Sequence, residues 1–119
     1  MPIGIHAHNN LQLAFSNTIT AIDCGADFAD ASVKGMGRGA GNCPLECLLP
    51  YVDKEKYNLK PILTLISNHF WEADGGQDWG FCTKQLLTGI FNQHPVKSIQ
   101  NHSDNLTSIY ERFQSGVEV

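Results

Sequence analysis

The chain has 119 residues, 42% of them hydrophobic and 17% charged, which is typical of a single globular domain. Its formal net charge of −4 argues against a general binder of nucleic acids or anionic membranes, because such binders carry a basic patch. No apolar run approaches the ~20 residues that span a bilayer. The N-terminus lacks the basic and apolar regions of a secretory signal, and the four cysteines fit a reducing compartment, so we expect a cytoplasmic protein.

The first third of the chain predicts alternating strands and helices. Residues 3–8 predict a β-strand, and residues 11–24 predict a helix whose apolar side chains recur at three- and four-residue spacing. Residues 27–34 predict a second strand, which the glycine-rich segment 35–42 connects to a helix that starts near Pro44. This order predicts an α/β fold, in which two parallel strands carry helices on the outside.

Local signals mark the helix ends. Asn9 or Asn10 can cap the start of the first helix, and Gly25 stands where a helix C-terminus favours a left-handed residue. Cys43 and Cys47 are four residues apart in the expected second helix. They are either half of a zinc site or two small buried residues, and we favour burial.

The rest of the chain predicts helices and loops. Residues 53–60 and 72–78 predict loops, residues 60–70 and 83–91 predict helices, and residues 95–114 allow one or two more. Two parallel strands form a poor independent core, because parallel strands are normally buried on both faces. We therefore expect the C-terminal part of a larger α/β protein.

The segment Ile3–Asn10 carries a His-x-His pattern at the end of the first strand. Residues i and i+2 of a strand point to the same side, so His6 and His8 can converge on one point. Two converging imidazoles are a common way to hold a divalent metal ion, although histidines this close in sequence are often ordinary surface residues. The C-terminal end of a parallel strand is also where α/β proteins bind their ligands.

The glycine-rich segment allows three interpretations. Gly35, Gly37 and Ala40 match a loose dinucleotide fingerprint, but no acidic residue ends a strand about 20 positions later, which argues against it. Backbone N–H groups at the helix start could instead bind a carboxylate or phosphate, with Arg38 adding a bidentate contact. The segment could also be a turn that lets strand and helix pack closely.

Asn42 closes this segment immediately before the helix. It could cap the helix. Its carboxamide oxygen could also complete a metal shell beside His6 and His8, because the ends of neighbouring parallel strands lie side by side.

Three motifs together resemble the DRE-TIM metallolyases, the HMGL-like enzymes, and most closely their 4-hydroxy-2-oxovalerate aldolase branch. The motifs are His6-Ala-His-Asn-Asn-Leu11, Asp30-Ala-Ser32 and Gly35-Met-Gly-Arg-Gly-Ala-Gly-Asn-Cys-Pro-Leu-Glu46. The segments Trp79-Gly-Phe81 and Leu87–Pro95 resemble the C-terminal part of aldolase-like members. The resemblance covers about residues 2–97.

The resemblance implies the C-terminal portion of a (β/α)8 TIM barrel. Residues 1–52 would be its last two β/α units, with strands seven and eight, and residues 53–119 a helical C-terminal region. It also implies a metal-dependent aldolase or lyase, which cleaves or forms a C–C bond in a 4-hydroxy-2-oxoacid through a metal-bound pyruvate enolate.

The resemblance assigns site residues as well. His6, His8 and Asn42 correspond to metal ligands, with Mn²⁺ or Mg²⁺ as the ion. The segment containing Gly37, Arg38, Gly39 and Gly41 would bind the 2-oxoacid substrate.

The chain departs from the family pattern at two places. The family's metal-binding aspartate and its neighbouring arginine lie on the first barrel strand, which nothing here matches, and Asp27 and Asp30 belong to the eighth-strand motif instead. Phe81 stands where relatives often have a tyrosine. We therefore expect the isolated chain to be inactive, and we assign no catalytic residue.

Two alternatives remain open. One is an acyl-CoA-dependent condensing enzyme of the isopropylmalate or homocitrate synthase type, against which the aldolase-like segment from Trp79 argues. The other is a non-catalytic or split-gene subunit that pairs with a partner chain or forms a homo-oligomer.

Overall fold

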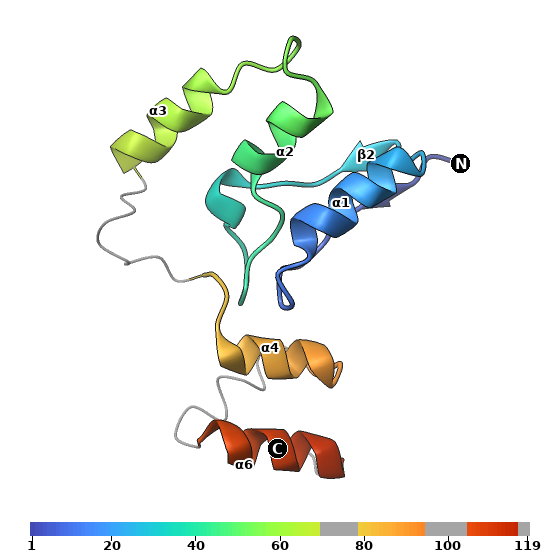
Figure 1. The fold of residues 1–119 in the computed structure, drawn as a ribbon, viewed down its shortest axis with the longest axis vertical. Helices are drawn as coiled ribbons and strands as arrows, with labels where there is room; N and C mark the ends of the chain where they lie inside the picture. The colour runs from blue at the N-terminus through green and yellow to red at the C-terminus, as the bar shows by residue number, and fades with distance from the viewer. Residues whose placement is uncertain (70–78, 95–104, 117–119) are drawn as a thin grey trace.

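The computed structural model describes residues 1–69, 79–94 and 105–116. Its two strands are parallel, with Gly4 opposite Phe28 and Ile5 opposite Ala29, as the alternating pattern predicts. Figure 1 shows the order of elements: β1 (Gly4–Ile5), α1 (Ala14–Asp23), β2 (Phe28–Ala29), η1 (Val33–Gly35), α2 (Leu45–Val52), α3 (Lys60–His69), α4 (Thr83–Ile90) and α6 (Leu106–Ser115).

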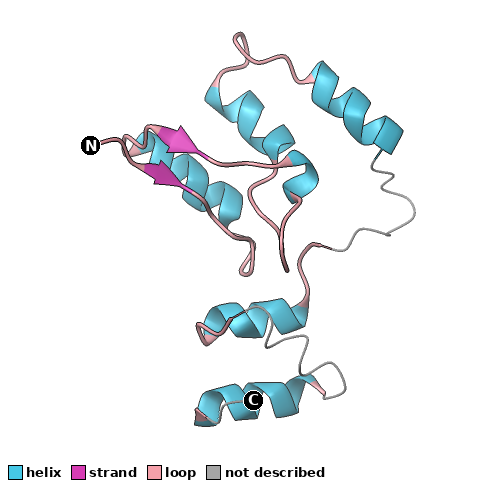
Figure 2. Ribbon diagram, turned by 180° about the vertical axis from the view of Figure 1, so that it is seen from behind, coloured by secondary structure: helices cyan, strands magenta, loops and turns pink. Residues whose placement is uncertain are grey.

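Helices cover one face of the β1–β2 sheet. The buried side chains Ala14, Cys43 and Leu48 form an apolar cluster there, against which Ala7 and Ala29 pack. Most of these residues are small, so α1 and α2 can approach the strands closely. The helix layer behind the two strands is visible in Figure 2.

The ends of α1 follow from the residues around them. The Asn9 side-chain oxygen accepts a hydrogen bond from the Ala14 amide at 3.1 Å, so Asn9 satisfies a donor at the helix start. The helix begins at Ala14 rather than near Leu11, because Gln12 has a left-handed φ of 58°. At the other end, Gly25 has a φ of 100° and closes the helix as the sequence predicts.

The second strand is shorter than the sequence predicts. Pairing stops at Ala29, and Val33–Gly35 forms a 3₁₀ turn, so the expected strand over residues 27–34 is wrong in extent. The physical reason is a change of partner. The Ser32 amide donates to the Cys43 carbonyl at 3.0 Å, which turns this segment away from β1 and toward the start of α2.

The cysteine pair is also placed differently from the prediction. Cys43 is buried but precedes α2, and Cys47 is exposed on that helix. Burial raises the pKa of the Cys43 thiol, which suits a protonated core residue. The two cysteines therefore do not form the buried helical pair that their spacing suggests.

The C-terminal region is helical, as predicted. α3 and α4 match the expected helices, and α6 confirms one helix within residues 95–114, whereas the expected loop at residues 72–78 lies outside the described residues. A second apolar cluster joins α4 to α6 through Leu87, Ile109 and Phe113. These two helices lie side by side in both ribbon views (Figures 1 and 2).

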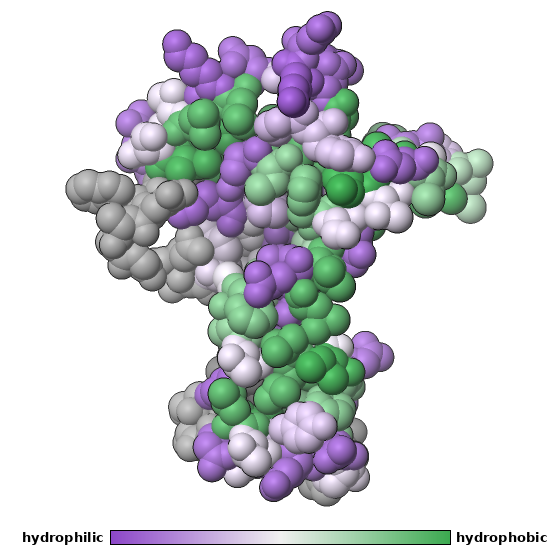
Figure 3. Space-filling view, in the orientation of Figure 1, coloured by the Kyte–Doolittle hydropathy of each residue, from purple (hydrophilic) through white to green (hydrophobic). Residues whose placement is uncertain are grey.

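The structure is more open than a closed domain of its length. Its radius of gyration is 16.5 Å, whereas a compact domain of this size has about 13.5 Å. Hydrophobic side chains reach the surface around α4 and where it meets the N-terminal region (Figure 3). Among the described helices, none is long and apolar enough to cross a bilayer.

Candidate metal centre

The two histidines of the His-x-His pattern lie together where β1 leaves the sheet. Their ring centroids are 5.0 Å apart and their planes meet at 79°. Both side chains are exposed, whereas Ala7 between them packs against the helix-side cluster. The strand alternation therefore places His6 and His8 on one face, opposite the face of Ala7 that packs against the helix-side cluster.

Asn42 joins this pair through the backbone. His8 and Asn42 form an isolated antiparallel bridge, and the neighbouring Asn9 amide donates to the Gly41 carbonyl at 2.8 Å. Side chains of directly opposed residues in an antiparallel pair lie on the same face. The structure therefore brings Asn42 beside His8.

The two polar atoms of the Asn42 carboxamide differ in their hydrogen bonds. Its Nδ2 donates to the Met36 carbonyl at 3.0 Å. Its Oδ1 is buried and accepts no hydrogen bond from any described residue. A buried acceptor without a donor is costly, and a cation would satisfy it.

The glycine-rich loop is shaped by close backbone contacts. The Asn42 amide donates to the Gly35 carbonyl at 2.8 Å, and the Gly41 amide donates to the Arg38 carbonyl at 3.0 Å. Gly41 has a φ of 84°, and a Cβ there would collide with the Gly35 carbonyl oxygen. A side chain at this position would therefore break the loop that carries Asn42.

The substrate-binding assignment to Gly37, Arg38, Gly39 and Gly41 stays a prediction. The structure places all four in this loop, with Arg38 exposed. A carboxylate supports the loop from α2, because Glu46 Oε2 accepts the Lys34 amide at 2.9 Å.

Trp79 and Gly80 form hydrogen bonds with the glycine-rich loop and with the turn before it. Trp79 Nε1 donates to the Lys34 carbonyl at 2.9 Å, and the Gly80 amide donates to the Gly39 carbonyl at 3.0 Å. Trp79, which belongs to the aldolase-like segment, therefore supports the loop through a hydrogen bond.

Two further polar residues near the loop were missed by the sequence analysis. Gln85 and Thr88 are buried on α4. Asn10 Nδ2 donates to the Gln85 carbonyl at 2.9 Å and to Thr88 Oγ1 at 3.3 Å. The available signal was the small pair Thr88-Gly89, because Gly89 lets α4 approach Asn10 closely.

The donor set fits a divalent cation in part. Two imidazoles and one carboxamide oxygen are nitrogen and oxygen ligands of the kind that a divalent ion such as Mn²⁺ accepts. Within residues 1–69, 79–94 and 105–116, no group of three or more His, Cys, Asp and Glu side chains is arranged to hold a metal. The described residues therefore offer two histidines and Asn42.

Three further histidines, His69, His94 and His102, follow the His-x-His pattern in the sequence. His69 and Phe81 are exposed, and Asp27 accepts the Ile3 amide at 2.8 Å. His102 and Trp71 lie outside the described residues.

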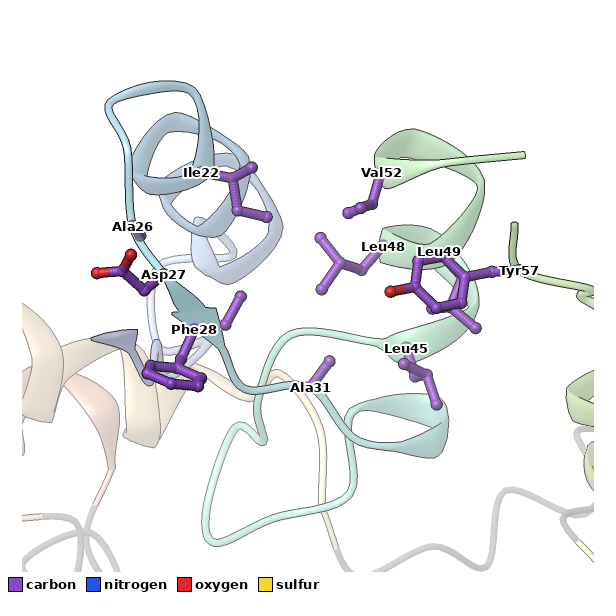
Figure 4. A pocket seen from close by; sticks show the side chains of 11 residues that line it. Ile22, Ala26, Asp27, Phe28, Ala31, Leu45, Leu48, Leu49, Val52 and Tyr57 are labelled. Carbon is purple, nitrogen blue, oxygen red and sulfur yellow. The ribbon is translucent and has the colours of Figure 1, made fainter. Parts of the chain in front are cut away.

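A pocket of about 440 Å³ lies between α1, β2 and α2 (Figure 4). Apolar side chains such as Ile22, Leu48 and Val52 line it, together with Tyr57. His6, His8 and Asn42 do not line it, so this pocket is separate from the candidate metal centre.

The chain has a parallel α/β core, with two histidines at a strand end and an asparagine on the adjoining glycine-rich loop. These features make it an α/β protein with a candidate metal site at its strand ends. The HMGL-like family model matches residues 1–67, which is more than half of the chain. The chain belongs to the HMGL-like family.

Curated relatives match stretches of about 50 residues of this chain. The chain is 57% identical over 47 residues to an oxaloacetate decarboxylase of Mycobacterium tuberculosis, which is 40% of this chain and 14% of that protein. It is 54% identical over 56 residues to a 4-hydroxy-2-oxovalerate aldolase of Thermus thermophilus, which is 47% of this chain and 16% of that protein. The chain thus aligns with about one sixth of the length of these relatives.

A solved structure resembles almost the whole chain. The N-terminal domain of a proposed aldolase from Bacteroides vulgatus superimposes with a TM-score of 0.76 at 37% sequence identity. The match covers 93% of this chain and 38% of that one. The likeness supports the α/β arrangement of a small parallel sheet with helices.

Proposed function

We propose that this chain forms the last two β/α units of a (β/α)8 barrel and the helical region behind them. In the complete barrel it supplies His6, His8 and Asn42 to a divalent-metal site of an aldolase. The observation that carries the proposal is the buried Asn42 Oδ1, which accepts no hydrogen bond from any described residue, on a residue that pairs with His8.

The uncovered face of the sheet supports the barrel. Helices cover the face of Ala29, whereas Phe28, the preceding residue of β2, points to the other face and is 64% exposed. Parallel strands are normally buried on both faces. Further strands that pair with the free edges of β1 and β2 would close a barrel and bury the Phe28 side chain.

The relatives' names narrow the reaction class. Aldol cleavage of 4-hydroxy-2-oxovalerate and decarboxylation of oxaloacetate break the same bond, between C3 and C4 of a 2-oxoacid. Both leave an electron pair at C3 that is delocalised onto the C2 oxygen. We therefore propose a 2-oxoacid substrate that loses its C4 substituent, and both reactions are candidates.

Each part of the chain has a defined task in this proposal. His6, His8 and Asn42 hold the ion, which when bound provides positive charge next to the developing negative charge of the substrate. The loop of Gly37, Arg38, Gly39 and Gly41 forms the substrate side of the site, where the exposed Arg38 guanidinium can pair with the carboxylate. The contacts of Trp79 and Gly80 keep this loop in place.

The test uses thermal unfolding followed by circular dichroism, with and without Mn²⁺. Because a ligand that binds the folded state raises its stability, we expect Mn²⁺ to raise the midpoint of the wild-type chain and not that of His6→Ala/His8→Ala. His69→Ala is the matched control, because His69 is an exposed histidine on α3. An equal rise in all three proteins would contradict the proposal.

Activity gives a second test. We expect no cleavage of either 2-oxoacid by the chain alone. We expect Mn²⁺-dependent cleavage when residues 1–52 replace the corresponding units in a complete 4-hydroxy-2-oxovalerate aldolase. Turnover by the isolated chain would contradict the expected inactivity, and full activity of a graft with His6→Ala/His8→Ala would contradict the assigned metal ligands.

A further inference from the structure

The side chain of His6 has a carboxylate partner on the neighbouring strand. His6 follows β1 and Asp30 follows β2, each one residue beyond the paired residues Ile5 and Ala29. The Asp30 amide donates to the Ile5 carbonyl at 2.9 Å, which holds the two chain segments side by side where the strands end. His6 Nδ1 and Asp30 Oδ2 are 3.0 Å apart.

This contact favours the tautomer of His6 in which Nδ1 carries the proton. An ionised carboxylate only accepts hydrogen bonds, so the Nδ1 atom that faces it must donate. A neutral imidazole has one N–H group, and Nε2 is then left with a free lone pair. Nε2 is therefore the atom of His6 that can bind a metal.

We propose that Asp30 is a positioning residue for the metal centre: it holds His6 in the Nδ1–H tautomer and turns Nε2 toward the ion. This inference rests on the proposed function. A carboxylate behind a metal-binding histidine fixes the orientation of the ring and raises its basicity as a ligand.

The other histidine of the pair is held in a different way. Among the residues that the structure describes, none forms a side-chain hydrogen bond with His8, which touches His6 edge-on and is fixed by its backbone bridge to Asn42. The two histidines thus differ in preorganisation. Loss of Asp30 should therefore change the tautomer of the His6 ring and leave the tautomer of the His8 ring unchanged.

The first measurement needs no metal. Long-range ¹H–¹⁵N correlation spectra at a pH where both rings are neutral report which nitrogen is protonated. We expect an Nδ1–H pattern for His6 in the wild type, and a shift toward the Nε2–H form in Asp30→Leu. Asp27→Asn is the control, because Asp27 lies on the same segment but accepts the Ile3 amide, and it should leave His6 unchanged.

The second measurement is Mn²⁺ affinity. Removal of a partner behind a metal ligand costs about 10- to 100-fold in affinity, so we expect a loss of that size in Asp30→Leu and a smaller loss in Asp30→Asn. The side chain of Asp30 is 68% exposed, so neither variant disturbs the core.

The outcomes separate this inference from the proposed function. An unchanged His6 tautomer in Asp30→Leu would overturn the positioning role, as would a changed tautomer with unchanged Mn²⁺ affinity. Failure of His6→Ala/His8→Ala to weaken Mn²⁺ binding would overturn the proposed function itself.

Discussion

The N-terminal α/β region, residues 1–52, and the C-terminal helical region, residues 79–116, each contain a buried apolar cluster. The buried core of the first cluster combines the small residues Ala14 and Cys43 with Leu48, whereas that of the second consists of the large residues Leu87, Ile109 and Phe113. The small residues let helices pack close to the strands, and the second cluster joins two helices. The candidate metal donors belong to the first region.

Hydrogen bonds join the two regions across their boundary. Trp79 Nε1, the Gly80 amide and Asn10 Nδ2 each form a hydrogen bond across the boundary. Hydrogen bonds are directional, so such a boundary can fix the shape of the glycine-rich loop. The difference between the regions suggests that stability and metal binding can be changed separately, which the following predictions test.

The largest effect is expected from Ile109→Ala in the C-terminal cluster. Ile109 is fully buried, so its truncation should lower the free energy of unfolding by about 2–5 kcal/mol. Urea denaturation measures this loss, and Leu106→Ala on the exposed surface of the same helix is the control. Mn²⁺ affinity should stay within about twofold of wild type under native conditions, and a parallel loss of affinity would contradict the separation of the regions.

An intermediate effect is expected from Gly37→Ala in the loop. A Cβ at Gly37 would lie 2.5 Å from Asn42 Nδ2, so the carboxamide must move. We expect about a 10-fold loss of Mn²⁺ affinity in a calorimetric titration, with little change in unfolding.

The matched comparison for Gly37→Ala is Asn42→Ala. If both substitutions act through the same carboxamide, the double variant should bind Mn²⁺ no more weakly than Asn42→Ala alone. Additive losses would show that Gly37 acts on the site by another route.

The smallest effect is expected from Trp79→Phe at the boundary. It removes the hydrogen bond to the Lys34 carbonyl and should cost about 0.5–1.5 kcal/mol. Hydrogen exchange should report the loss as faster exchange of the Asn42 amide, which is bonded to Gly35 in the same loop. Unchanged exchange would mean that residues 79–80 do not hold the loop in place.

The sequence predicts the helices better than the strands. Helix periodicity is a local property, so α1, α3 and α4 lie close to their expected positions. The length of β2 depends on its hydrogen-bond partner, and Ser32 pairs with Cys43 rather than with β1. Nothing in residues 27–34 alone reveals that choice.

The sequence likewise predicts some features of the candidate site and not others. The common face of His6 and His8 follows from strand alternation, and Asn42 follows from the adjacency of neighbouring strand ends, which the family resemblance supports. The Asp30 carboxylate behind His6 requires the register between two strands, which the sequence does not contain. Gln85 and Thr88 look like solvent-facing residues of an amphipathic helix, and only the packing of α4 against Asn10 buries them.

The most direct test of the account is a titration of the wild-type chain with Mn²⁺, followed by the electron paramagnetic resonance signal of the free ion. The account predicts one bound Mn²⁺ per chain, retained in His69→Ala and lost in His6→Ala/His8→Ala. Absence of binding in the wild type, or equal binding in the double variant, would contradict the claim that His6 and His8 form a metal centre.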